Sequence, residues 1–212
     1  WRPSANAIAA APLTRFMREC GQRDYAALYD WSVAAPEDFW PAIWRFCGVA
    51  ADTRPDGSAW SHAVSGPRRM APPNDSGLRW FVDARLNFAE NLLRFRDDRT
   101  ALVFWNELGR QRALTYAELC DEVAVTADAL RRCGVVAGDR VAGFMPNLPE
   151  TVIAMLAAAS LGAIWSSCSP DFGVNGVLDR FGQIAPRILF CAASYRYGGK
   201  EHQCLERVAE IG

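Results

Sequence analysis

The fold is decided by Asp139-Arg-Val-Ala-Gly-Phe-Met145, then Pro149-Glu-Thr-Val-Ile-Ala-Met-Leu156, then Gly162-Ala-Ile-Trp-Ser-Ser167. The first and third segments are short and mainly apolar, which indicates buried strands. The segment between them begins with proline and glutamate, which are favoured in the first turn of a helix. Strand, helix and strand in this order predict a parallel sheet that helices cover on both faces.

The same alternation continues toward the C-terminus. We expect a helix over 174–184, a strand over 187–192 and a helix over 201–211. With parallel strands near Val141, Ile164 and Leu189, the fold class is α/β, a three-layer domain with a mostly parallel sheet flanked by helices.

A hairpin and a long helix precede these segments. Strands are predicted over 100–106 and 111–116, joined by a turn, after a short helix over 87–95. Thr115-Tyr-Ala-Glu118 has the pattern of a capping box, so a long helix is expected to begin there and to end at Gly134. Its predicted buried positions are Leu119, Val123, Ala127 and Leu130.

The first third of the chain has a different character. Helices are predicted over 13–21, 25–31 and 36–46, and their aromatic side chains are expected to pack with one another. Pro, Gly, Asp and Ser are frequent over 49–77, which predicts an irregular linker that wraps over a larger body. We therefore divide the chain into a helical N-terminal extension with its linker, 1–77, and a larger domain, 78–212.

Composition excludes several classes of protein. Of the 212 residues 50% are hydrophobic and the net charge is −1, which argues against a disordered chain and against a nucleic-acid partner. The longest apolar run, 152–165, is too short to span a membrane. Seven cysteines without a Cys-x-x-Cys pair predict no metal site and indicate buried thiols, such as Cys191, in a reducing, cytoplasmic compartment.

One loop has the composition of an anion site. Ala192-Ala-Ser-Tyr-Arg-Tyr-Gly-Gly-Lys200 places Arg196 and Lys200, the only lysine, on either side of Gly198 and Gly199. Between a strand and a helix, such a loop favours a phosphate group; the alternative is a glycine turn with solvated charges. Signatures of a nucleophile elbow, a dinucleotide site and a P-loop are absent from the sequence.

Several longer stretches carry a family resemblance. Leu86-Asn-Phe-Ala-Glu-Asn-Leu-Leu93, Leu114-Thr-Tyr-Ala-Glu-Leu119 and residues 134–150 resemble the acetyl-CoA synthetase branch of the acyl-adenylate-forming superfamily. Within that branch, residues 166–184 and Tyr195-Arg-Tyr-Gly-Gly-Lys200 are most similar to the acetoacetate–CoA ligases.

The resemblance implies a two-step reaction in which ATP, with Mg²⁺, activates acetoacetate as an adenylate and CoA then displaces AMP. Residues 78–212 would be the first, incomplete part of the AMP-binding domain, inactive without the rest of the same polypeptide, and no catalytic residue would lie in this chain. The alternatives are a ligase for another short acid (acetate, propionate or 3-hydroxybutyrate) and a non-catalytic binding domain derived from the ligase fold.

The family's CoA site supplies the candidate residues. By resemblance, Arg196, Gly198, Gly199 and Lys200 would face the 3′-phospho-ADP end of CoA, and the loop with Ser169 and Asp171 would border it. The sequence departs from the family pattern in two places: a tyrosine separates Arg196 from the glycines, and the glycines of the earlier loop are replaced.

Overall fold

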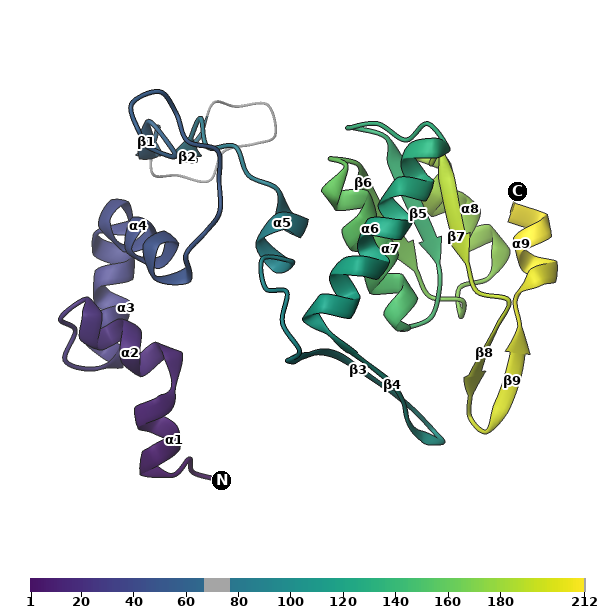
Figure 1. Cartoon of the computed structure of the whole chain (residues 1–212), viewed down its shortest axis with the longest axis horizontal. Helices are drawn as coiled ribbons and strands as arrows, with labels where there is room; N and C mark the ends of the chain where they lie inside the picture. Colours follow the sequence, from purple (N-terminus) through teal and green to yellow (C-terminus); the bar gives the residue numbers. More distant parts are fainter. Residues whose placement is uncertain (67–76, 212) are drawn as a thin grey trace. The chain divides into compact units, whose positions relative to one another are not determined.

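A computed structural model describes residues 1–66 and 77–211, so most of the Pro-rich part of the predicted linker, 67–76, lies outside the described residues. The chain divides into two compact units, Trp1–Leu86 and Asn87–Gly212. The predicted domain boundary between residues 77 and 78 stays a prediction. Each unit is described by itself below (Figure 1).

The first unit is built from helices followed by a small sheet. Its elements are α1 (Ala5–Ala10), α2 (Pro12–Glu19), α3 (Tyr25–Ala34), α4 (Pro36–Cys47), β1 (His62–Ser65) and β2 (Arg79–Val82). The three predicted helices are confirmed as α2, α3 and α4. The linker prediction is wrong for 62–65, because β1 pairs antiparallel with β2. Turn-forming residues on both sides obscured this short strand in the sequence.

Aromatic side chains pack with one another in this unit, as predicted. The Phe16 ring meets Phe46 at a centroid distance of 5.0 Å, and Trp44 lies 4.7 Å from Trp60 and 4.6 Å from Phe81. Trp60 precedes β1 and Phe81 lies in β2, so the rings join α4 to the small sheet. Ring pairs at such distances add to the burial of apolar area.

The second unit alternates strands and helices. Its elements are α5 (Phe88–Leu92), β3 (Thr100–Asn106), β4 (Gly109–Thr115), α6 (Tyr116–Arg132), β5 (Arg140–Phe144), α7 (Pro149–Ser160), β6 (Ile164–Cys168), α8 (Val174–Gly182), β7 (Ile188–Cys191), β8 (Ser194–Tyr197), β9 (Lys200–Gln203) and α9 (Leu205–Ile211). β3 and β4 form the predicted antiparallel hairpin.

The predicted α/β sheet is confirmed. β5, β6 and β7 are parallel and lie in the order β6-β5-β7. The crossover through α7 moves away from β5 in one direction, and the crossover through α8 returns past β5 in the other. Right-handed crossovers of opposite direction place their helices on opposite faces. Accordingly, Val141 packs in one buried cluster with α6 and α7, and Phe144 packs in another with α8.

Local sequence signals fix α6. The Thr115 Oγ1 atom accepts a hydrogen bond from the Glu118 amide at 3.1 Å, and the Glu118 carboxylate accepts one from the Thr115 amide at 2.8 Å. The bonds that Thr115 donates to this carboxylate, the one from its backbone amide first, hold the pKa of Glu118 below its usual value. The four positions predicted to be buried on this helix are all buried: Leu119, Val123, Ala127 and Leu130.

The central strand carries a glycine for a steric reason. A Cβ atom on Gly143 would lie 2.6 Å from the Trp165 ring, which extends from β6 across β5. On the other side of β5 the Phe190 ring of β7 lies 6.1 Å from Trp165, centroid to centroid. The two rings therefore cover β5 at the position where it has no side chain.

Two predictions about the C-terminal part are wrong. The segment 192–200 is not a loop before a helix: β8 and β9 form an antiparallel hairpin, and α9 begins only at Leu205. Cys191 is exposed, because β7 pairs on one side with β5 and with no other described strand. Among the residues that the structure describes, no helix has the length and apolar character that crossing a membrane requires.

Candidate functional site

The candidate site lies where the parallel strands end. In an open parallel sheet, ligands bind beyond the carboxyl ends of the strands, next to the strand where the order reverses. Here that strand is β5, and the segments that follow β5, β6 and β7 begin at Met145, Ser169 and Ala192. The last of these leads directly into the β8–β9 hairpin.

The hairpin turns tightly through two glycines. Tyr197 pairs with Lys200, so Gly198 and Gly199 are the two residues of the turn, with φ angles of 62° and 73°. Two consecutive positive φ angles are the mark of a type I′ turn, which glycine adopts without strain. The glycines are therefore required by the hairpin itself, and the N-terminus of α9 contributes nothing to this loop.

The two turn amides hold a carboxylate. The Gly198 N–H donates to Glu107 Oε1 at 2.6 Å, and the Gly199 N–H donates to Glu107 Oε2 at 2.8 Å. Glu107 lies in the turn between β3 and β4, and the two hairpins approach each other at their tips (Figure 1). Adjacent amides that point toward one oxyanion form a nest, so this turn has the geometry of an anion site.

Cations flank the same turn. Arg196 and Lys200 are both exposed, and an Arg196 Nη2 atom donates to the Gly199 carbonyl at 3.4 Å. Four of the predicted CoA-contacting residues, Arg196, Gly198, Gly199 and Lys200, thus lie together at the hairpin tip. Two amide donors in the turn, with one cation in each of the two flanking strands, favour an anionic ligand such as a phosphate.

The other two candidates, Ser169 and Asp171, lie at the base of the hairpin. The Tyr195 hydroxyl donates to Asp171 Oδ1 at 2.6 Å, and the Ser169 hydroxyl donates to Asp171 Oδ2 at 2.8 Å. These bonds, the one from Tyr195 first, hold the pKa of Asp171 below its usual value. The same carboxylate raises the pKa of the Tyr195 phenol. Both oxygens of Asp171 are thereby engaged within the chain.

Two further contacts reinforce the base. The Tyr195 ring stacks on His202 of β9 at a centroid distance of 5.1 Å, and Arg207 of α9 donates to the Pro170 carbonyl at 2.9 Å. The segment after β6 is therefore joined to β8 and to α9. This arrangement gives the hairpin a fixed root, independent of its tip.

The described residues give no support to two other kinds of site, a nucleophilic thiol and a metal centre. Burial raises the pKa of the Cys168 and Cys204 thiols, so neither is a thiolate nucleophile at neutral pH. Within residues 1–66 and 77–211, no three His, Cys, Asp or Glu side chains come together in a way that would hold a metal ion.

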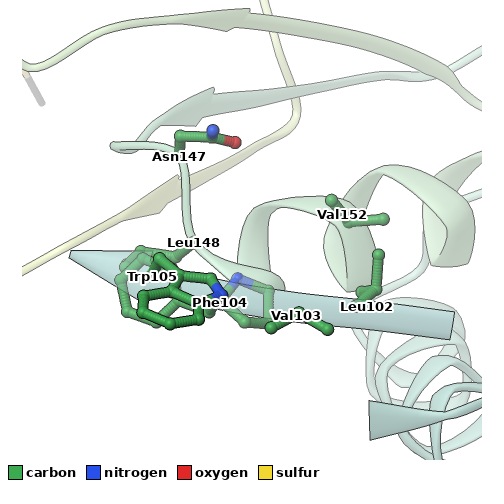
Figure 2. A pocket seen from close by; sticks show the side chains of 8 residues that line it. Leu102, Val103, Phe104, Trp105, Asn147, Leu148 and Val152 are labelled. Atoms are coloured by element: carbon green, nitrogen blue, oxygen red, sulfur yellow. The ribbon is translucent and has the colours of Figure 1, made fainter. Parts of the chain in front are cut away.

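A second hollow lies between β3 and the start of α7. Figure 2 shows Trp105, Leu148 and Val152 around an open groove of about 300 Å³, with Asn147 as its polar side chain. No charged side chain lines this groove. It therefore lacks the cations that would favour a phosphate group, and the hairpin remains the better candidate.

Sequence reasoning missed the residues that complete the site: Glu107, Tyr195, His202 and Arg207. Glu107 is 91 residues from Gly198 along the chain, and no local pattern joins them. The hairpin itself had a signal, since a Gly-Gly pair between two short polar–aromatic runs is typical of a two-residue β-turn.

Comparison with known proteins now decides the family. Residues 88–211, more than half of the chain, match the family of AMP-binding enzymes. The chain belongs to this family. Residues 25–92 of this chain match a second family, the acetyl-coenzyme A synthetase N-terminus.

This chain is similar to acetoacetyl-CoA synthetases from several organisms. It is 44% identical to an acetoacetyl-coenzyme A synthetase of Rhizobium meliloti, over 100% of this chain and 32% of that protein. It is 46% identical to an acetoacetyl-CoA synthetase of Macaca fascicularis, over 89% of this chain and 27% of that one.

A solved structure supports the same relationship. The acetoacetyl-CoA synthetase from Streptomyces lividans superposes with a TM-score of 0.87 at 40% identity, covering 100% of this chain and 32% of that one. The chain thus spans about a third of the length of the relatives that it matches.

Proposed function

We propose that this chain is the N-terminal portion of an AMP-forming acid–CoA ligase that converts acetoacetate, ATP and CoA to acetoacetyl-CoA, AMP and diphosphate. The observation that carries the proposal is 44% identity to an acetoacetyl-coenzyme A synthetase over the whole of this chain. The fold agrees, since the Streptomyces lividans enzyme aligns over the same extent at a TM-score of 0.87.

The proposed reaction proceeds through an acyl-adenylate. The carboxylate of the acid attacks the α-phosphate of ATP and releases diphosphate, and the CoA thiol then attacks the acyl carbon and releases AMP. A phosphate ester leaves far more readily than an oxide ion, so the adenylate makes thioester formation feasible. Positioning of the reactants and stabilisation of the phosphate charges supply most of the catalysis in such transfers.

This chain would contribute to the second step. We propose that Arg196, Lys200 and the amides of Gly198 and Gly199 bind the 3′-phospho-ADP end of CoA. The support is chemical: the two amides hold the Glu107 carboxylate at 2.6 and 2.8 Å, so the donor pair is already shaped for an oxyanion. Two exposed cations beside it suit a group with more than one negative charge.

For Ser169 and Asp171 the proposal is narrower. Both side chains lie at the hairpin root, where Asp171 accepts hydrogen bonds from Ser169 and Tyr195. They would border CoA while holding the root of the hairpin in place. A direct bond from Asp171 to CoA would require one of these internal bonds to be exchanged.

ATP and Mg²⁺ belong to the proposed reaction but not to the described residues. No side-chain group among them fits a metal ion, so we propose that Mg²⁺ is bound with ATP by other parts of the longer polypeptide. The proposed setting is the cytoplasm, since all seven cysteines are free, as expected in a reducing compartment.

A second candidate acid follows from a more distant relative. The chain is 36% identical, over 89% of its length, to a malonamoyl-CoA synthetase of Penicillium aethiopicum. Malonamate is also a short acid with a carbonyl group at its third carbon, so the same branch accepts close analogues of acetoacetate. The higher identity to acetoacetyl-CoA synthetases favours acetoacetate.

The test is AMP release by the product of the complete open reading frame. Acetoacetate, malonamate, acetate, propionate and 3-hydroxybutyrate would be compared at matched concentrations with ATP, Mg²⁺ and CoA. Acetoacetate should give the highest kcat/KM. Preference for another acid would overturn the substrate, and no AMP release from a folded protein with any acid would favour a binding domain.

Variants then test the CoA site. Arg196→Ala and Lys200→Ala should each raise the apparent KM for CoA by about tenfold, as expected for one charge-assisted contact, with little change in the KM for ATP. Arg23→Ala, which removes an exposed arginine of the first unit, is the matched control. An unchanged KM for CoA in both hairpin variants would remove the hairpin from the CoA site.

A further inference from the structure

The anion nest at the tip of the β8–β9 hairpin already has an occupant from the same chain. Both oxygens of the Glu107 carboxylate are used, one by each glycine amide. Glu107 comes from a different hairpin, and its position in the exposed β3–β4 turn leaves it free to move away without unfolding either sheet. The turn is thus bound by an anion that is covalently part of the protein.

Two anions cannot occupy the same pair of amides. A carboxylate carries one negative charge, whereas a phosphate monoester carries close to two at neutral pH and has three acceptor oxygens. A phosphate would therefore form the stronger bonds with the amides and with Arg196 and Lys200. To form them it must first displace Glu107, so the free energy of the internal bonds is subtracted from the free energy of binding.

We propose that Glu107 is an internal competitor of the 3′-phosphate of CoA for the amides of Gly198 and Gly199. The inference rests on the proposed function in one respect, the identity of the ligand. Glu107 lowers the affinity for every ligand that enters the nest and leaves unchanged the affinity for ligands that do not reach it.

The alternative role for Glu107 is that of a brace, and the structure argues against it. The hairpin has its own ladder from Ser194–Gln203 to Tyr197–Lys200, and its root is fixed by the bond from Tyr195 to Asp171. These contacts hold the hairpin whether or not Glu107 is bound. Competition and bracing predict opposite changes in CoA affinity when the carboxylate is removed.

The experiment uses the complete enzyme with two thiol substrates, CoA and dephospho-CoA, which lacks the 3′-phosphate. Glu107→Gln and Glu107→Ala should lower the KM for CoA about three- to tenfold, the range expected for loss of two exposed charge-assisted hydrogen bonds. The KM for dephospho-CoA should stay the same. The variants should therefore discriminate more strongly between the two substrates than the parent enzyme does.

A control variant separates the effect of direct contact with the glycine amides from the effect of a negative charge nearby. Glu201→Gln also removes one negative charge, from the β8–β9 hairpin itself, but the Glu201 carboxylate accepts a bond from Ser194 instead of from the glycine amides. It should change the KM for CoA much less than Glu107→Gln. Equal effects of the two variants, or a parallel fall in the KM for both thiols, would show that only the loss of negative charge matters. Either result would overturn the proposal.

A binding measurement keeps the inference separate from the proposed function. Calorimetric titration with adenosine 3′,5′-bisphosphate needs no acid, no ATP and no turnover. Tighter binding to Glu107→Gln than to the parent would support competition even in a protein that releases no AMP, in which case the proposed function alone fails. Ligase activity with unchanged or weaker binding by the variant would overturn the inference and leave the function standing.

Discussion

Replacing Gly143 with alanine would place a methyl carbon 2.6 Å from Cζ2 and 2.7 Å from Cη2 of the Trp165 ring. Carbon atoms in favourable contact lie about 3.5–4.0 Å apart, so the ring would have to move by about 1 Å. Trp165 lies against the cluster shared by β5, α6 and α7, and it contacts Phe190 on the far side. Neighbours on both sides therefore restrict how far the half-buried ring can move.

The expected cost follows from two opposing effects. Overpacking of this kind destabilises a protein by about 1–3 kcal/mol. Removing a glycine from a strand interior returns about 0.5–1 kcal/mol of backbone entropy. We expect Gly143→Ala to lower the free energy of unfolding by about 1–2 kcal/mol, a net effect of these two contributions.

Urea unfolding followed by far-UV circular dichroism measures this change. Gly182→Ala is the matched control, because nothing lies within 4 Å of its added carbon and the substitution should stabilise α8 by about 0.5 kcal/mol or more. Trp165→Phe removes the clashing atoms, so the double variant should be less destabilised than the sum of the single ones. Additive effects, or a Gly143→Ala protein as stable as the parent, would refute the steric reasoning.

Three further predictions concern single interactions. Thr115→Ala removes the capping box of α6 and should cost about 1 kcal/mol in urea unfolding, whereas Thr126→Ala, in the middle of the same helix, should cost less. Asp171 has a lowered pKa, so its bond to Tyr195 stabilises the fold fully above the ordinary pKa of 3.8. This stabilisation is lost as the pH falls further. The difference in free energy of unfolding between the parent and Asp171→Asn should therefore shrink between pH 7 and pH 3. Arg112 joins two glutamates from α6 and α7, so Arg112→Met should lower the free energy of unfolding by about 1 kcal/mol in dilute buffer and by less in 1 M salt.

The parallel sheet was predictable because its information is local. The strands around Val141, Ile164 and Leu189 are short apolar runs separated by helices with proline or glycine at their ends, and the structure confirms each of them. The same reasoning predicted burial of Cys191 and was wrong there. An apolar run marks a strand, but only its neighbours in the sheet decide how much of that strand is covered.

The site was predictable only in part. The composition of 196–200 predicts an anion-binding turn, and the structure places these residues together at one hairpin tip. The bond from Tyr195 to Asp171 and the bonds from the glycines to Glu107 join segments that are far apart in sequence. Long-range contacts of exposed polar side chains follow from the tertiary fold and leave no periodic trace in the sequence.

The position of β5 in the sheet also has a consequence for the order of folding. β5 pairs with β6 across one helical crossover, but its pairing with β7 closes a loop about twice as long. Each doubling of loop length adds about 0.6 kcal/mol of closure entropy, so pairing β5 with β6 costs less than pairing β5 with β7. We therefore expect the β5-α7-β6 unit to form first and the segment that carries the hairpin to join it later. Native-state hydrogen exchange should show slower exchange in β5 than in β7.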